Sequence, residues 1–121
     1  MALGIDVFRD YFSEYKDQSV LDAGHLIPMK MKAWLDLTEK KEKGMHVNDR
    51  DLRKHRQDVF RLFRLIGDND FIPVPQEVLN DVKAFIGIVR EQKFDTASIG
   101  IQVSKNDILD DYDKRYVLKN K

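Results

Sequence analysis

The stretch from His25 to Ile66, HLIPMKMKAWLDLTEKKEKGMHVNDRDLRKHRQDVFRLFRLI, decides the fold of this chain. On both sides of Gly44 its apolar residues recur every three or four positions, which is the spacing of an amphipathic helix. Gly44 is expected to end the first helix by adopting the left-handed backbone conformation, and Asn48 is placed to cap the helix that follows. The sequence therefore predicts a central antiparallel helical hairpin over residues 22–67.

The two helices of this hairpin each have one apolar face. The first helix is expected to begin before Pro28, which is tolerated in the opening turns, and to end at Lys43. Its predicted buried stripe is Ile27, Met31, Trp34, Leu35 and Thr38. The second helix is expected to end at Gly67, with an inner face made of Leu52, His55, Val59, Leu62, Phe63 and Ile66.

Further helices are expected on both flanks of the hairpin. Residues 1–18 have an aromatic-rich helical stripe, and residues 75–117 contain two more helical patterns, with Pro75 opening the first and Ser104 capping the second. Gly87 suggests a close helix contact. Residues 96–103 alternate weakly and could form a short strand, but they have no clear partner strand, so an extended linker is favoured. We therefore predict one all-α domain over residues 1–121, a bundle of about five helices around the hairpin.

Composition limits the classes of protein to consider. The 121 residues carry no net charge, but the segment 30–64 has 11 Lys or Arg against 6 Asp or Glu. There is no cysteine and no apolar run near the roughly 20 residues of a membrane span. The N-terminus lacks the basic start and apolar core of a secretory signal. A cytoplasmic protein without a membrane contact is the expectation.

Two segments of the hairpin carry a family resemblance. Lys30-Met-Lys-Ala33-Trp-Leu-Asp-Leu and Lys54-His55-Arg-Gln-Asp58-Val-Phe-Arg-Leu62 resemble the C-terminal helical part of the AbiEii/AbiGii-type nucleotidyltransferases, the toxin components of abortive-infection systems. Lys30 and Ala33 match a Lys-x-x-Ala helix, and Lys54 and Asp58 match the basic segment that opens the next helix. His55 departs from that pattern, because an Asp is common at its position. The segment from Phe8 to Gln18 is similar to the opening helix of the family.

The catalytic features that this resemblance implies are missing. Such enzymes have a Gly-Gly or Gly-Ser phosphate loop and an Asp-x-Asp magnesium pair, between the opening helix and the C-terminal helices. Here Gln18 is followed almost at once by the entry to the hairpin, and no Gly-Gly or Gly-Ser pair occurs. Three Asp-x-Asp matches, at 49–51, 68–70 and 111–113, fall at helix ends or in a charged helix. We therefore expect no catalytic residue, no metal ligand and no resident cofactor.

Lys30, Lys54, His55 and Asp58 are the candidate site residues, since they are expected to meet across the hairpin. One interpretation is a structural ion-pair network in a non-catalytic helical module that acts through protein contacts. An alternative is a fragment that binds nucleotide and magnesium through Lys30, Lys54 and Asp58. A second alternative is an RNA-binding domain, which is disfavoured because acidic residues interrupt the basic run and no aromatic residue is interleaved with it.

The missing palm domain also leads to an expectation about assembly. If such a domain covers the hairpin in the family, its absence uncovers apolar residues on the first two helices. The candidates are Phe8, Tyr11, Phe12, Tyr15, Met29, Met31 and Trp34. Large exposed apolar patches are uncommon on soluble monomers, so we expect a homodimer that buries them.

Overall fold

The computed structural model describes residues 23–66 and 72–117 of the chain. The regular elements of these residues are all helical, which confirms the all-α class. They comprise the α-helices α2 (Ala23–Glu42), α3 (Asp49–Arg61), α4 (Gln76–Arg90) and α5 (Lys105–Tyr112), and the short turns η2 (Leu62–Leu65), η3 (Thr96–Ile99) and η4 (Asp113–Val117). The described part thus has four α-helices, and the helix expected over residues 1–18 lies outside it.

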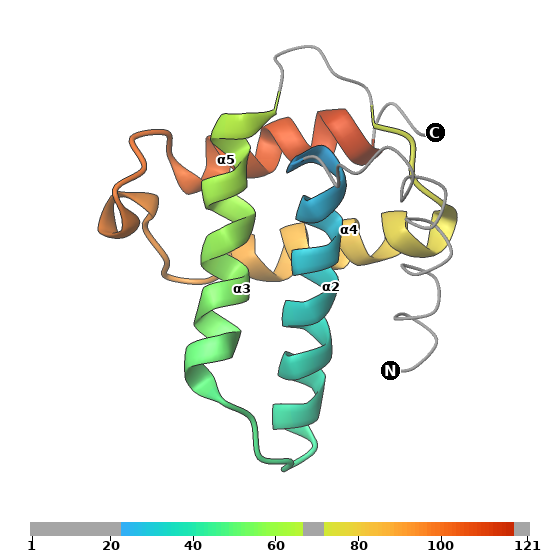
Figure 1. Ribbon diagram of the computed structural model, residues 1–121, viewed down its shortest axis with the longest axis vertical. Coiled ribbons are helices and arrows are strands. Elements are labelled where there is room, and N and C mark those ends of the chain that lie inside the picture. Colours follow the sequence, from blue (N-terminus) through green and yellow to red (C-terminus); the bar gives the residue numbers. More distant parts are fainter. Residues whose placement is uncertain (1–22, 67–71, 118–121) are drawn as a thin grey trace.

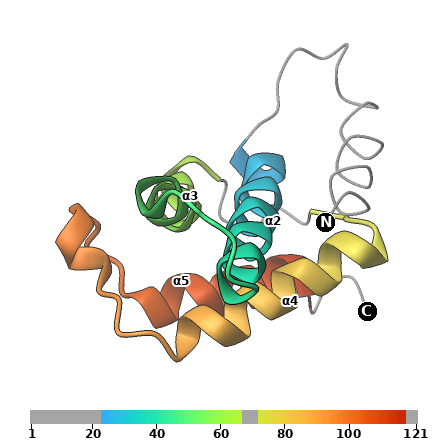
Figure 2. The ribbon, with the colours of Figure 1, turned by 90° about the horizontal axis from the view of Figure 1, so that it is seen from below.

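The helices form two layers. α2 and α3 run side by side as the predicted hairpin, and α4 and α5 run across one face of it (Figure 1). The view from below shows α4 and α5 together on one side, with α2 and α3 seen end-on on the other side (Figure 2). One face of the hairpin is therefore covered by the second layer.

Local sequence signals explain the turn of the hairpin. Gly44 has a φ of 82°, the left-handed conformation that lets the chain leave α2. The side chain of Asn48 accepts hydrogen bonds from the backbone N–H groups of Arg50 and Asp51, as a capping residue does. Lys43 Nζ lies 3.1 Å from Glu39 Oε1, an i,i+4 ion pair in the last turn before Gly44. The cap and the stop are both confirmed.

The second hairpin helix ends earlier than predicted. α3 is α-helical only to Arg61, and the chain continues as the 3₁₀ turn η2 before Ile66 becomes extended with a ψ of 149°. A 3₁₀ turn commonly tightens the last turn of an α-helix, and it preserves the apolar spacing. The periodicity of the sequence therefore could not locate this change.

The core lies where the two layers meet. Ile27, Met31 and Trp34 of α2 are buried there, and the Trp34 ring meets the Phe85 ring of α4 edge-on at 5.3 Å between centroids. Phe60, which the predicted inner face omitted, is fully buried against Phe85 and Phe94. The burial of Met31 and Trp34 corrects the expectation that they form an uncovered patch.

Two expectations for the C-terminal half are also wrong. Gly87 faces solvent, and a Cβ at this position would meet no atom within 4 Å, so the glycine does not serve close packing. Part of the expected extended linker is instead the turn η3, in which the Asp95 side chain caps the first turn and Gly100 ends it with a φ of 78°. The cap formed by Ser104 is confirmed, because its hydroxyl accepts from the N–H of Asp107.

Candidate functional site

The four candidate residues meet on the seam between α2 and α3. Asp58 Oδ2 lies 3.2 Å from Lys30 Nζ of the opposite helix and 3.5 Å from Lys54 Nζ one turn away. Arg61 approaches the other oxygen of the same carboxylate at 3.9 Å. The side chains of Lys30 and Asp58 are only 27% and 19% exposed. The structure therefore brings the predicted residues together around one carboxylate.

His55 belongs to this cluster through its position rather than through a hydrogen bond. Its Nδ1 is buried and makes no hydrogen bond with a described residue. Burial of the imidazole lowers the pKa of His55, the Lys30 ammonium lowers it further, and Asp58 acts in the opposite direction. The neutral imidazole is favoured in the folded protein, so His55 does not add to the positive charge of the seam near neutral pH.

The Asp-x-Asp matches do not form metal sites among the described residues. Asp49 and Asp51 lie in the first turn of α3, where acidic groups complement the helix dipole, and Lys41 lowers the pKa of Asp49 through a hydrogen bond. Asp111 pairs with Arg115. The match at 68–70 lies outside the described residues. Within 23–66 and 72–117, no group of three or more His, Asp or Glu side chains is placed to hold a metal ion.

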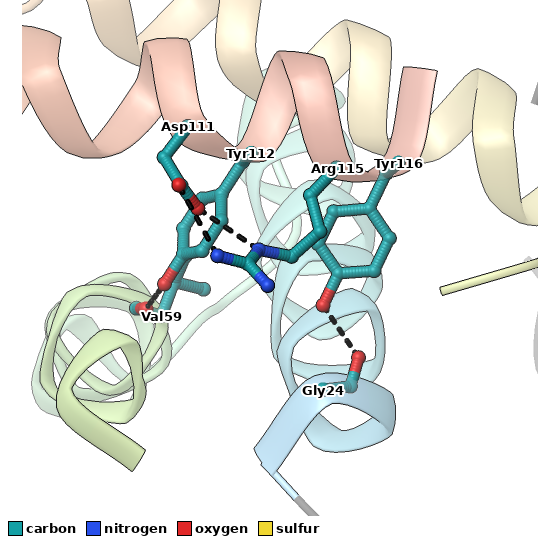
Figure 3. Close-up of polar contacts among 6 residues, drawn as sticks. All are labelled: Gly24, Val59, Asp111, Tyr112, Arg115 and Tyr116. Carbon is teal, nitrogen blue, oxygen red and sulfur yellow. Dashed lines mark hydrogen bonds and ion pairs between the residues drawn. The ribbon is translucent and has the colours of Figure 1, made fainter. Parts of the chain in front are cut away.

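A second polar cluster, where α5 and η4 cross the hairpin, was not predicted. Tyr112 donates to the Val59 carbonyl of α3 and Tyr116 to the Gly24 carbonyl of α2, each at 2.5 Å (Figure 3). The Tyr112 and Tyr116 rings meet edge-on at 6.0 Å between centroids, and Arg115 of the same helical segment is only 5% exposed. It donates to both oxygens of Asp111 at 2.9 and 3.2 Å.

This crossing cluster has a structural role that its chemistry explains. A desolvated guanidinium needs a carboxylate that satisfies its donors, and Asp111 supplies a two-point contact. Burial raises the pKa of Tyr112 well above its usual value, so its hydroxyl keeps the proton that it donates to Val59. The i,i+4 spacing of Tyr112 and Tyr116 places them on one face of the helix, but it does not indicate which carbonyl groups they meet.

A third cluster joins α2 to α4. Lys32 Nζ lies 3.0 Å from Asp36 and 3.8 Å from Asp81, with the Lys32 side chain 12% exposed. Burial raises the pKa of Asp81, Lys32 opposes this shift, and the neighbouring carboxylate of Asp36 adds to it. The i,i+4 spacing of Lys32 and Asp36 was a usable signal in the sequence. No signal in the sequence indicated that Asp81 of α4 would be the second partner of Lys32.

Arg56 links α3 to the segment that follows α4. Its guanidinium carbon lies 4.3 Å from the centre of the Phe94 ring, and its Nη1 donates to Gln92 Oε1 at 2.9 Å. Burial lowers the pKa of Arg56, and Arg53 adds to this effect. Lys105 adds a further link, because its Nζ donates to the carbonyls of Arg90 and Gln92. Arg56 therefore does not contribute to a free basic surface.

Comparisons with protein-family models, with curated proteins and with solved structures found no match to this chain. The resemblance of the hairpin to the abortive-infection nucleotidyltransferases therefore stays a prediction. Among the helices of the described residues, none combines the length and the apolar character that crossing a bilayer requires.

Proposed function

We propose that this chain is a non-catalytic helical module that acts through protein contacts, similar to the C-terminal domain of the abortive-infection nucleotidyltransferase toxins. The observation that carries this proposal is the place of Asp58 at the centre of the candidate site. Lys30, Lys54 and Arg61 all converge on its carboxylate, at 3.2, 3.5 and 3.9 Å. The position between the cations is thus occupied by a negative charge that belongs to the protein.

This arrangement favours a structural seam over a phosphate site. A phosphate oxygen that approached Lys30 or Lys54 would also approach the Asp58 carboxylate, and the two negative charges would repel each other. The Asp58 carboxylate already forms an ion pair with a lysine of each helix, so the cluster joins α2 to α3 without any ligand. His55, held toward its neutral form, does not offset this repulsion.

Titration calorimetry with ATP and GTP in the presence of Mg²⁺ tests the proposal. We expect no saturable heat for either nucleotide up to millimolar concentration. The matched variants are Lys54→Ala in the seam and Lys40→Ala, an exposed lysine near the end of α2 that makes no ion pair with a described residue. Micromolar binding that Lys54→Ala abolishes and Lys40→Ala preserves would overturn the proposal in favour of a nucleotide-binding fragment.

The cytoplasm as compartment and a homodimer as assembly are further parts of the proposal. The argument for the dimer now has fewer supports, because Met31 and Trp34 pack inside their own chain. Phe8, Tyr11, Phe12 and Tyr15 lie outside the described residues. Light scattering at micromolar concentration decides between the two states: the dimer predicts twice the 14.2 kDa mass of one chain, and a species of that single mass would end the idea.

A further inference from the structure

The outward face of α3 carries five exposed cations. They are Arg50, Arg53, Lys54, Arg61 and Arg64, the last in the turn η2 that continues the helix. At about 100° per residue, they fall within an arc of about 100° around the helix axis, and at 1.5 Å per residue they span about 21 Å. We call these five residues the basic face of α3.

The acidic residues of α3 lie on the two flanks of this face, Asp49 on one and Asp51 and Asp58 on the other. Asp58 points toward Lys30 of α2, and Asp49 points toward Lys41, whose Nζ is 2.9 Å from its Oδ1. Asp51 lies about 100° around the helix from Arg50, on the same flank as Asp58. In the sequence these acids interrupt the basic run, which was one of the two reasons for disfavouring RNA binding. The structure places these acids at the edges of the basic face, where Asp58 contacts Lys54 and Arg61, and leaves its centre free of carboxylates.

The charge of the basic face is poorly neutralised within the described residues. Arg50, Arg53 and Arg64 make no ion pair there, and Lys54 and Arg61 only share Asp58 with Lys30. By contrast, Arg90 on α4, which is partly exposed, does have a close partner, because its Nη2 lies 2.9 Å from Asp110. In a chain without net charge, this face is a local concentration of positive charge that attracts a complementary surface.

We propose that the basic face of α3 docks an acidic helical segment of a protein partner; this rests on the proposed function and names its partner class. The face is one helix wide, which matches another helix that presents carboxylates at the same spacing. Four of its five cations are arginines, which bind carboxylates through two parallel hydrogen bonds and are enriched at protein interfaces. Next to Arg64, Leu65 is 73% exposed and offers an apolar contact at the end of the face.

Two features make a nucleic acid the weaker fit. Single-stranded nucleic acid is usually held by aromatic side chains that stack on its bases, and the basic face includes no aromatic residue. A duplex presents two phosphate backbones, and on one flank of the face Arg56 is engaged with Gln92 and Phe94. On the other flank lie Asp51 and Asp58.

A pair of designed peptides tests the proposal. Both are alanine-rich helix formers with five glutamates; in one the glutamates follow the 3, 4, 4, 3 spacing of a single face, and in the other they are spread around the helix. Fluorescence anisotropy at about 0.1 M salt measures their affinities. We expect the one-face peptide to bind roughly tenfold more tightly than the spread peptide. Equal affinities would refute the proposal.

Charge-reversal variants test whether the peptide binds to the basic face of α3. Arg53→Glu with Arg61→Glu reverses two charges of the basic face and should weaken the one-face peptide at least roughly tenfold. Lys83→Glu with Lys114→Glu makes the same change in net charge at exposed positions of α4 and η4, and should leave the affinity within about twofold. Both variants should keep the helical circular dichroism signal. Equal loss in both would mean that only net charge matters, and would sink the proposal.

An RNA duplex of about 20 base pairs is the third probe. We expect it to bind more weakly than the one-face peptide, with an affinity that falls steeply with salt. Tighter binding of the duplex would overturn the peptide proposal and the protein-contact function together. Failure of the peptides alone would remove only the proposed partner, because the nucleotide titration tests the Asp58 seam separately.

Discussion

The two ends of the hairpin are built differently. At the tip, residues 39–51, nearly every side chain is exposed, and the chain is held by Gly44, the Asn48 cap and ion pairs between near neighbours. At the other end α5 and η4 cross both helices, and fully buried tyrosines reach backbone carbonyls 53 and 92 positions away in the sequence. The tip is a product of local sequence, whereas the crossing is a product of tertiary packing. We therefore expect the crossing to contribute more to the free energy of unfolding than the tip does.

The largest expected difference between the two regions comes from their apolar side chains. Phe60→Ala removes a fully buried ring that packs on Phe85 and Phe94, and should reduce the free energy of unfolding by about 3–5 kcal/mol. Met45→Ala at the tip, where the side chain is 55% exposed, should change it by less than about 0.5 kcal/mol. Urea denaturation measures both. Similar losses would show that the tip shares the cooperative core.

A smaller effect is expected from the tyrosine hydroxyls of the crossing. Tyr112→Phe removes the donor to the Val59 carbonyl but keeps the ring, and should cost about 1 kcal/mol. Tyr116→Phe should do the same at the Gly24 carbonyl. Two neutral substitutions would mean that the rings alone hold the crossing.

The seam between α2 and α3 should respond to pH through His55. Its pKa is lowered in the folded protein from 6.5, so below that pH the unfolded chain binds a proton that the folded protein resists. Stability should therefore fall on acidification from about pH 7, until the lowered folded pKa is passed. His55→Gln should flatten this part of the profile, measured by urea denaturation between pH 7.5 and 5. An unchanged slope in the variant would contradict the assigned cause.

The same contrast explains what the sequence could predict. The stop at Gly44, the caps at Asn48 and Ser104, and the apolar stripe of α4 follow from local spacing, and each was predicted. The seam was predicted as well, since Lys54 and Asp58 are one turn apart and the hairpin brings Lys30 opposite. These features require only helical geometry and one short connection.

The remaining features depend on how the layers dock. Phe60 lies beside the apolar stripe of α3, and only α4 and the chain after it make that position interior. The expected patch at Met31 and Trp34 is buried for the same reason. In the sequence Arg115 is one more charged residue of a polar helix, and only the packing of the layers makes it 5% exposed. The basic face of α3 likewise emerges only once the direction of each acid is known.

The central claim is that Asp58 joins α2 to α3, and a double-mutant cycle with Lys30 tests it most directly. The cycle compares the free energies of unfolding of the unmodified chain, Lys30→Met, Asp58→Asn and the double variant. The pair is 3.2 Å apart and partly buried, so a favourable coupling of about 0.5–1 kcal/mol is predicted. Strictly additive single losses would contradict the structural seam and return both residues to the list of candidates for ligand binding.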